Sequence, residues 1–136
     1  MIYQKEIRLP HFDRGFNLIT DYIFSDLDYI PNAGLLNIFL HHTSAALTIN
    51  ENVDSSVRRD LETFINGLIP EKPQSYTHIL EGEDDMPAHI KSSVFGASIN
   101  IPITNGMLNL GTWQGIYLCE FRNNGGRRKI TLTIIY

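Results

Sequence analysis

The sequence has little cysteine and no long apolar segment. Cys119 is the only cysteine, so no disulfide can form within the chain, and no apolar run approaches the ~18 residues of a membrane span. The first residues, MIYQKE, lack the apolar core of a signal peptide. Secreted mini-proteins and membrane proteins are therefore excluded, and we expect a cytoplasmic protein with no membrane partner.

Positive charge is also scarce. Lysine and arginine number 11 against 15 aspartates and glutamates, a net charge of −4, which argues against nucleic acid or an anionic membrane as a partner. The 136 residues, 43% of them hydrophobic, match one globular domain, because domains cluster at ~100–150 residues. We therefore expect residues 1–136 to form a single domain.

Apolar periodicity predicts short strands with helices interspersed. Helices are expected over 21–30 with Thr20 as N-cap, over 55–68 after Asp54 and before Pro70 and Pro73, and over 85–94. Strands are expected over 2–9, 35–40, 45–49, 76–80, 98–104, 107–110, 116–122 and 127–136. Gly15 and Asn17 should break the chain, and Asn105-Gly106 should turn a hairpin. The fold class is α+β, a single compact domain with a mainly antiparallel sheet and about three helices.

The tetrapeptide NNGG after Arg122 predicts a second hairpin, between 116–122 and 127–136. Its apolar residues would share one face against the core: Tyr117, Cys119, Phe121, Ile130, Leu132 and Ile134. Arg122 would lie opposite Arg127, and like charges in that position are destabilising. This pair suggests an anion beside it, either a neighbouring carboxylate or a bound phosphate. The alternative is a solvated sheet end where Glu120 neutralises one arginine.

Histidines and acids form the second group of candidates. Asp85 and His89 lie four residues apart, so they share one face of the predicted helix. A carboxylate beside an imidazole can orient it as a base or as a metal ligand, although an acidic helix N-terminus explains the same pattern. The imidazoles of His42, His78 and His89 would suit Zn²⁺. No tight ligand spacing such as HExxH supports that metal.

Four acids crowd five residues and repel one another: Glu81, Glu83, Asp84 and Asp85. Such a run is either a solvated loop or a cation site, and Mg²⁺ often sits on one or two carboxylates plus substrate phosphates. A divalent metal, Zn²⁺ or Mg²⁺, is therefore the expected cofactor, with no organic cofactor.

Thr43 and Ser44 offer hydroxyls that could bind an anion or end a strand. Trp113 offers either a stacking surface or a packed turn. Cys119 falls on an apolar face and is expected to be a buried structural thiol rather than a nucleophile.

Four segments carry a family resemblance: HHTSAALTINEN (41–52), DSSVRRDL (54–61), EGEDDMPAHIK (81–91) and LGTWQGIYLCEFR (110–122). Together they resemble the YjbQ-like family, named as secondary thiamine-phosphate synthase enzymes. The resemblance is collinear over nearly the whole chain. It implies a β-sandwich-like core, a homotrimer and a polar pocket near a subunit interface. Phe121 departs from the pattern, because many members have a histidine there.

The resemblance also implies site residues. Catalytic residues would be His42, Asp85, His89 and Glu120. Residues that bind the substrate or its phosphates would be Thr43, Ser44, Glu51, Asn52, Trp113, Gln114 and Arg122, with Arg127 completing a phosphate clamp. The implied reaction condenses a hydroxymethylpyrimidine pyrophosphate with a thiazole phosphate, so the expected partner is a small phosphorylated or anionic molecule. Two alternatives are a metal-dependent hydrolase or lyase and a non-catalytic trimeric anion-binding protein.

Overall fold

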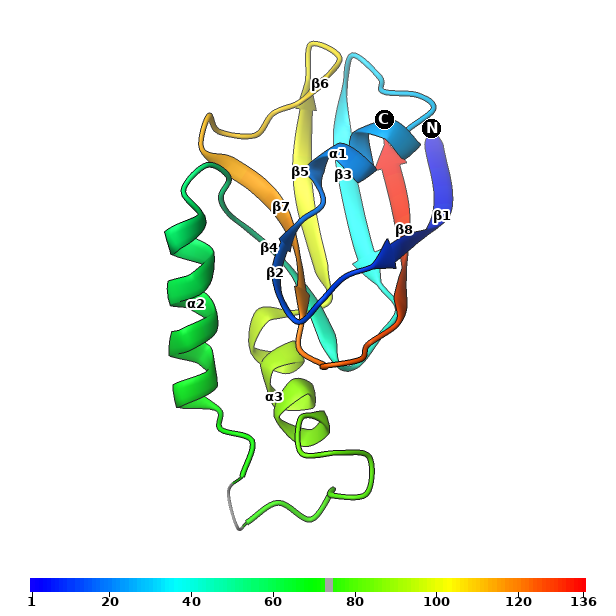
Figure 1. Ribbon diagram of the computed structural model, residues 1–136. Helices are drawn as coiled ribbons and strands as arrows, with labels where there is room; N and C mark the ends of the chain where they lie inside the picture. The colour runs from blue at the N-terminus through cyan, green and yellow to red at the C-terminus, as the bar shows by residue number, and fades with distance from the viewer. Residues whose placement is uncertain (73–74) are drawn as a thin grey trace.

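Alternating apolar residues build two antiparallel sheets that pack face to face, and two helices cover one of them (Figure 1). The computed structural model describes residues 1–72 and 75–136, so Pro73 lies outside the described residues. In these ranges the elements are β1 (Ile2–His11), β2 (Gly15–Leu18), α1 (Thr20–Asp26), β3 (Ala33–Leu40), β4 (Ala45–Glu51), α2 (Ser55–Leu68), α3 (Asp85–Phe95), β5 (Ser98–Thr104), β6 (Met107–Leu108), β7 (Gln114–Glu120) and β8 (Arg127–Ile135). The predicted α+β class is confirmed.

The larger sheet has the strand order β1-β8-β3-β5-β6, and the smaller has the order β2-β7-β4. Strand β8 lies between the first strand and β3, with Ile2 paired to Ile135 and Leu36 to Ile134. The β5–β6 hairpin is confirmed. Asn105 and Gly106 both have positive φ, 52° and 75°, as a tight two-residue hairpin requires.

Two apolar cores separate the three layers. The first lies between the sheets and includes Leu36, Ile38, Leu47, Ile101, Ile116, Leu118, Ile130 and Leu132. The second lies between the smaller sheet and the helices α2 and α3, and includes Phe16, Ala46, Ile65, Ala88, Tyr117, Cys119 and Phe121. Successive residues of β7 therefore face different cores, since side chains alternate along a strand.

The predicted hairpin between 116–122 and 127–136 is wrong. Strand β7 pairs with β2 and β4, whereas β8 pairs with β1 and β3, so the connection between them crosses from one sheet to the other. The predicted hairpin required the apolar residues of the two strands to share one face, whereas both faces of β7 are covered by other layers of the fold. Cys119 packs under the helices while Ile130 packs between the sheets, and these residues do not share one face.

Four other local predictions are wrong. Residues 76–80 form no strand, and the segment around Gly15 and Asn17, expected as a break, is strand β2 paired with β7. Helix α1 ends at Asp26, well short of the predicted boundary. Thr20 does not cap it, because its Oγ1 instead accepts a hydrogen bond from the backbone N–H of Ile116 at 2.9 Å.

Helix α2 agrees with its predicted bounds, and part of its apolar face is exposed. Asp54 caps it by accepting a hydrogen bond from the backbone N–H of Ser56 at 2.9 Å. Ile65 is buried, yet Phe64 and Leu68 are 70% and 61% exposed, so much of the apolar stripe points outward. No helix within the described ranges has the length and apolarity to cross a membrane.

A polar junction fixes α2 to the rest of the molecule. The Oδ1 atom of Asn66 accepts hydrogen bonds from Nζ of Lys91 at 2.7 Å and from Nη2 of Arg14 at 3.0 Å. Lys91 is buried on α3, and its ammonium lies 5.6 Å from the centroid of the Phe121 ring. Helix α2 is thus anchored through one of its own residues, the amide of Asn66, whose oxygen is shared by two cations.

We predict that Cys119 is unreactive in the folded protein. Burial raises the pKa of its thiol, so the thiol stays protonated at mildly alkaline pH and the nucleophilic thiolate is scarce. Labelling with dithiobis(nitrobenzoate) should be at least about 100-fold slower in buffer than in concentrated guanidinium chloride. Equal rates in the two solvents would contradict this burial.

Candidate functional site

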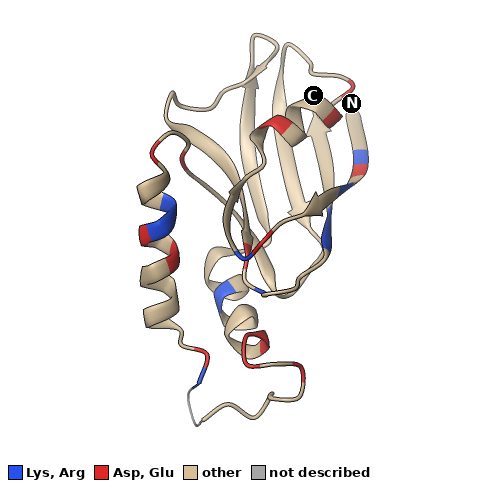
Figure 2. Cartoon of the chain, in the orientation of Figure 1, with Lys and Arg blue, Asp and Glu red and all other residues tan. Residues whose placement is uncertain are grey.

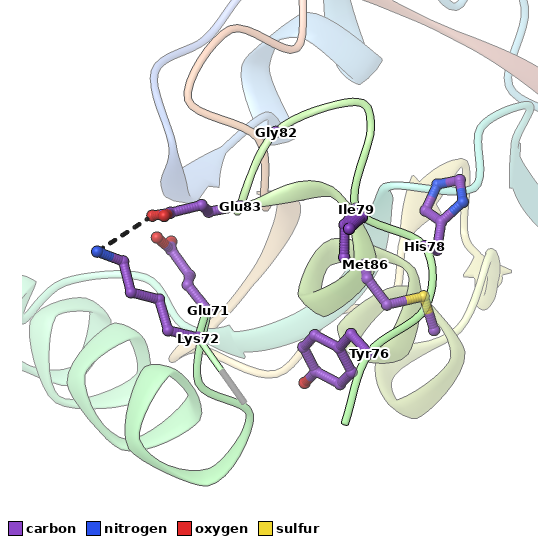
Figure 3. Close-up of a pocket in the computed structure, with 8 residues that line it drawn as sticks. All are labelled: Glu71, Lys72, Tyr76, His78, Ile79, Gly82, Glu83 and Met86. Atoms are coloured by element: carbon purple, nitrogen blue, oxygen red, sulfur yellow. Dashed lines mark ion pairs between the residues drawn. The ribbon is translucent and has the colours of Figure 1, made fainter. Parts of the chain in front are cut away.

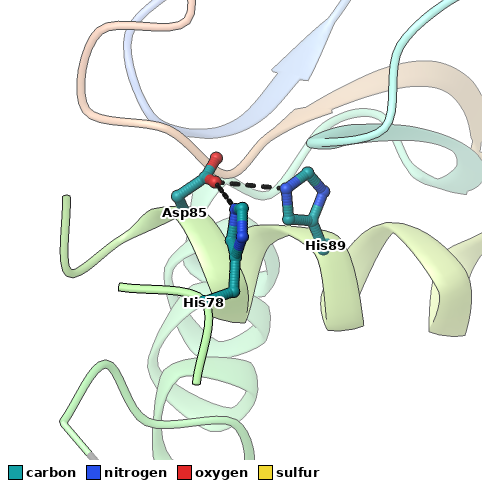
Figure 4. A group of neighbouring side chains, drawn as sticks. All are labelled: His78, Asp85 and His89. Atoms are coloured by element: carbon teal, nitrogen blue, oxygen red, sulfur yellow. Dashed lines mark hydrogen bonds and ion pairs between the residues drawn. The ribbon is translucent and has the colours of Figure 1, made fainter. Parts of the chain in front are cut away.

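Three side chains converge at the N-terminal end of α3, and we call them the Asp85 cluster (Figure 4). His78 and His89 each place Nε2 against Oδ2 of Asp85, at 2.7 and 3.2 Å. One potential ligand atom from each residue lies within 4.8 Å of the other two. The side chain of Asp85 is 2% exposed, whereas those of His78 and His89 are 45% and 31% exposed. Burial raises the pKa of Asp85, but a hydrogen bond from His78 and the charges of Arg122 and His89 outweigh it, so the net pKa is lowered.

Arg122 holds the acidic loop and the start of α3 together. Its Nη1 donates to Oδ1 of Asp85 at 2.5 Å, its Nε to Oδ2 of Asp84 at 2.9 Å, and its Nη2 to the carbonyl of Glu81 at 2.9 Å. The same Asp84 oxygen accepts the backbone N–H of Asn123 at 2.9 Å. The anion expected beside Arg122 is therefore a pair of neighbouring carboxylates.

The proton on His89 is placed by its contact with Thr43. His89 Nδ1 lies 2.8 Å from the backbone carbonyl of Thr43, and a carbonyl can only accept, so Nδ1 carries a proton and donates it. A neutral imidazole would then present a bare Nε2 to Oδ2 of Asp85, which is also an acceptor. Two acceptors at 3.2 Å require a shared cation, either a second proton on His89 or a metal ion.

A cavity of about 420 Å³ adjoins the cluster on the side of His78 (Figure 3). Its lining consists of Glu71, Lys72, Tyr76, His78, Ile79, Gly82, Glu83 and Met86. His78 is therefore both a wall of the cavity and a member of the cluster. At the opposite side, Nζ of Lys72 lies 3.5 Å from Oε2 of Glu83.

His42, expected as a catalytic residue and a metal ligand, does not belong to the Asp85 cluster. Its Nε2 accepts a hydrogen bond from the backbone N–H of Lys129 at 2.8 Å. Burial and the nearby Arg128 lower its pKa, which favours the neutral imidazole that this contact requires. The structure thus brings together two of the three histidines expected as ligands and adds the carboxylate of Asp85.

Glu120, which the resemblance places among the catalytic residues, forms a buried ion pair with Arg128. Its Oε1 accepts from Nε of Arg128 at 2.8 Å and its Oε2 from Nη2 at 2.6 Å. Ser44 was expected to bind an anion, but its Oγ accepts a hydrogen bond from Nη2 of the same guanidinium at 3.0 Å. Glu120 lies on β7 and Arg128 on β8, so the pair joins the two sheets. Glu120 thus does neutralise an arginine, but the partner is Arg128 and the pair is buried rather than at a solvated sheet end.

Four of the residues expected to bind substrate lie at the other end of the smaller sheet. Ala45 pairs with Glu120 near the Asp85 cluster, whereas Glu51 pairs with Gln114 at the opposite end. Six residues of strand separate these ends, about 20 Å at the usual rise per residue. Asn52 donates its amide to the carbonyl of Gln114 at 3.1 Å, and Trp113 is 61% exposed beside it.

Arg127 and Arg122 do not face each other, because the hairpin that would pair them does not form. Arg127 donates Nε to the carbonyl of Leu9 at 3.0 Å and Nη2 to that of Arg8 at 3.1 Å, which holds β1 in place. Both arginines expected to clamp a phosphate thus bond to protein acceptors. Figure 2 shows the acidic residues gathered in the loop before α3.

Comparison with known proteins places the chain in a family. The family model described as UPF0047 protein YjbQ-like matches residues 5–136. The chain belongs to the YjbQ-like family. The UPF0047 protein YjbQ of Salmonella typhimurium is 51% identical over 136 residues, and that of Escherichia coli O157:H7 is 48% identical, each covering 98% of both chains.

A solved structure supports the same assignment. An uncharacterized conserved protein of the yjbq/upf0047 family from Clostridium acetobutylicum is 36% identical with a TM-score of 0.81, and the match covers 96% of this chain and 99% of that one. The names of these relatives state a family and no reaction, so the reaction of this YjbQ-like chain has to be argued from its site.

Two contacts of this YjbQ-like site could not be expected from sequence. Thr43 acts through its backbone carbonyl rather than its hydroxyl, and Arg122 reaches Asp85 across 37 positions of the chain. The spacing of Asp85 and His89 was the one local signal for the cluster, because residues four apart are neighbours on a helix. Phe121, expected from the resemblance to be a departure from the family pattern, is buried under the helices.

We predict that Glu120 acts mainly in stability. Glu120→Ala leaves Arg128 buried without its partner and should lower the free energy of unfolding by about 3–5 kcal/mol. Urea denaturation followed by circular dichroism measures this change. The control Glu51→Ala, at a partly exposed site, should stay within about 0.5 kcal/mol. A loss below about 1 kcal/mol for Glu120→Ala would show that the ion pair does not support the fold.

Proposed function

We propose that this protein is a metal-dependent enzyme for a small organic substrate, with His78, Asp85 and His89 as ligands of a zinc-type divalent ion. The observation that carries the proposal is the contact between Nε2 of His89 and Oδ2 of Asp85. Because Nδ1 of His89 carries the ring proton and donates it in a hydrogen bond to the carbonyl of Thr43, both atoms of that contact present lone pairs in the neutral imidazole. A divalent cation shared by these two atoms and Nε2 of His78 would remove the repulsion.

The donor set fits zinc better than magnesium. Two imidazole nitrogens and one carboxylate oxygen are the ligands of many catalytic zinc sites, which keep a further position open for water or substrate. Magnesium prefers oxygen ligands in octahedral geometry, and two of the other acids of the loop are engaged elsewhere. Asp84 bonds to Arg122, and Glu83 lies beside Lys72.

The surrounding residues provide the support that such ligands need. Arg122 fixes Asp85 through Oδ1 and leaves Oδ2 directed at the two imidazoles. Thr43 fixes the ring of His89 through its carbonyl. A bound zinc ion would supply a Lewis acid and lower the pKa of its water ligand to about 7. His78, half exposed on the wall of the cavity, would place the bound ion next to a substrate there.

Hydrolysis or elimination fits this arrangement best. A diphosphate leaving group needs positive charge near its oxygens, usually from arginines. Arg122 and Arg127 instead bond to carboxylates and carbonyls of the protein. An open zinc position beside a cavity serves the attack of water on a small substrate without such a clamp.

Thiamine phosphate formation is the second candidate. It is supported by the motif matches at His42, Asp85 and His89, and by the cavity beside His78, whose volume of about 420 Å³ has room for a heteroaromatic ring. The expected reactants are a hydroxymethylpyrimidine pyrophosphate and a thiazole phosphate, and the products are thiamine phosphate and pyrophosphate.

We predict that one zinc ion binds per chain at the cluster. His89→Ala and Asp85→Asn should each weaken zinc binding by more than about 100-fold, the upper range for residues that only support a ligand. Competition with a chromophoric chelator measures the affinity. His11→Ala replaces an exposed histidine outside the cluster and should leave it unchanged. Weak binding by the wild type, or equal loss in the His11 control, would refute the metal site.

A direct assay separates the two reactions. We predict that zinc-loaded protein hydrolyses small esters or phosphate esters at a rate that falls at least about 100-fold in Asp85→Asn, with little formation of thiamine phosphate from the two precursors. Turnover is followed by chromatography of substrates and products. Faster formation of thiamine phosphate than hydrolysis would reverse the ranking. Binding of phosphate compounds without turnover in either assay would indicate a non-catalytic anion-binding protein.

A further inference from the structure

The cavity beside the Asp85 cluster has two unlike sides. Tyr76, Ile79 and Met86 supply apolar surface next to His78, while the charged residues lie at the opposite side (Figure 3). Its volume of about 420 Å³ lies within the usual range of small-molecule sites, ~300–1,000 Å³. Half-buried Met86 comes from α3 one residue after Asp85, so the apolar wall and the cluster share a rigid element.

We propose that this cavity binds the uncharged or cationic organic part of the substrate, next to the reacting group held at the cluster. The proposal rests on the proposed function, because it takes His78 as the link between cavity and metal. Aromatic and aliphatic surface of this kind supplies binding energy through burial, and methionine adapts its shape to the group it contacts. Tyr76 and Met86 are then specificity residues rather than catalytic ones.

The charges of the cavity favour this class of group over an anion. Among the described lining residues Lys72 is the one cation besides a protonated His78, and it lies 3.5 Å from Glu83. Glu71, the second lining carboxylate, bonds to Arg14, which is outside the lining. A phosphate or carboxylate on the charged side of the cavity, away from the cluster, would therefore meet two carboxylates, and the one lysine among the described lining residues already lies beside one of them. An ammonium group would meet favourable charge.

Methyl NMR of the methionines tests the proposal in the full chain. The chain has three methionines, Met1, Met86 and Met107, and only Met86 lines the cavity. Protein labelled with ¹³C at the methionine methyls is titrated with benzyl alcohol, benzylamine and phenyl phosphate. We expect the Met86 signal to shift with the first two, at an affinity at least about 10-fold higher than for phenyl phosphate. The signals of exposed Met1 and Met107 should not move.

Two tryptophan variants provide matched controls. Ile79→Trp fills the cavity and should abolish the Met86 shift, while Leu80→Trp changes the adjacent residue, which is 94% exposed and not part of the lining, and should preserve it. An unmoved Met86 signal, equal binding of phenyl phosphate, or equal effects of the two variants would overturn the proposal.

Zinc titration of the same samples separates this proposal from the proposed function. We expect both variants to keep the zinc affinity of the wild type. Zinc binding without a Met86 response would overturn the cavity proposal alone. A Met86 response without zinc binding would overturn the metal site while leaving the specificity of the cavity supported.

Discussion

The guanidinium of Arg122 is the contact on which the site depends. It joins the connection after β7 to the acidic loop and to the first turn of α3, through Asp84 and Asp85 together. Without it, two adjacent carboxylates with little exposure would repel each other at the place where the imidazoles converge. Charge-assisted bonds from one planar group both neutralise the acids and fix their orientation. The geometry of His78 and His89 around Asp85 therefore follows from a residue that belongs to a different layer of the fold.

A second buried pair has a parallel role between the sheets. Glu120 and Arg128 lie where β7 and β8, now in different sheets, come closest to their connection. A buried ion pair contributes little net stability compared with apolar residues, but the loss of either partner is strongly destabilising because the remaining charge is left buried and unpaired. Arg122 and Arg128 thus fix the position of the connection that crosses from β7 to β8, and the candidate site lies directly beside this connection. The motif residues that the resemblance marks are in this sense partly structural.

Prediction from sequence succeeded where the interactions are local. The bounds of α2 and α3 and the hairpin at Asn105-Gly106 follow from periodicity, capping and turn geometry, which neighbouring residues determine. The partners of β7 and β8 do not, because an apolar strand with a glycine-rich connection is equally suited to a hairpin or to a crossing between sheets. In the site, the spacing of Asp85 and His89 was sufficient to place them together. His78 could not be placed, since the expected strand over 76–80 does not form and its position depends on a loop.

The place of β8 has a consequence for how the chain acquires its structure. Strand β8, which follows all the other strands of the fold in chain order, lies between β1 and β3 and supplies the hydrogen bonds to both. While the ribosome is still making the C-terminal residues, β1 has no neighbour in its sheet and β3 has one open edge. Exposed strand edges attract other chains. The larger sheet thus closes only once β8 is in place, so this fold depends on contacts between residues more than 130 positions apart and belongs with slowly folding topologies.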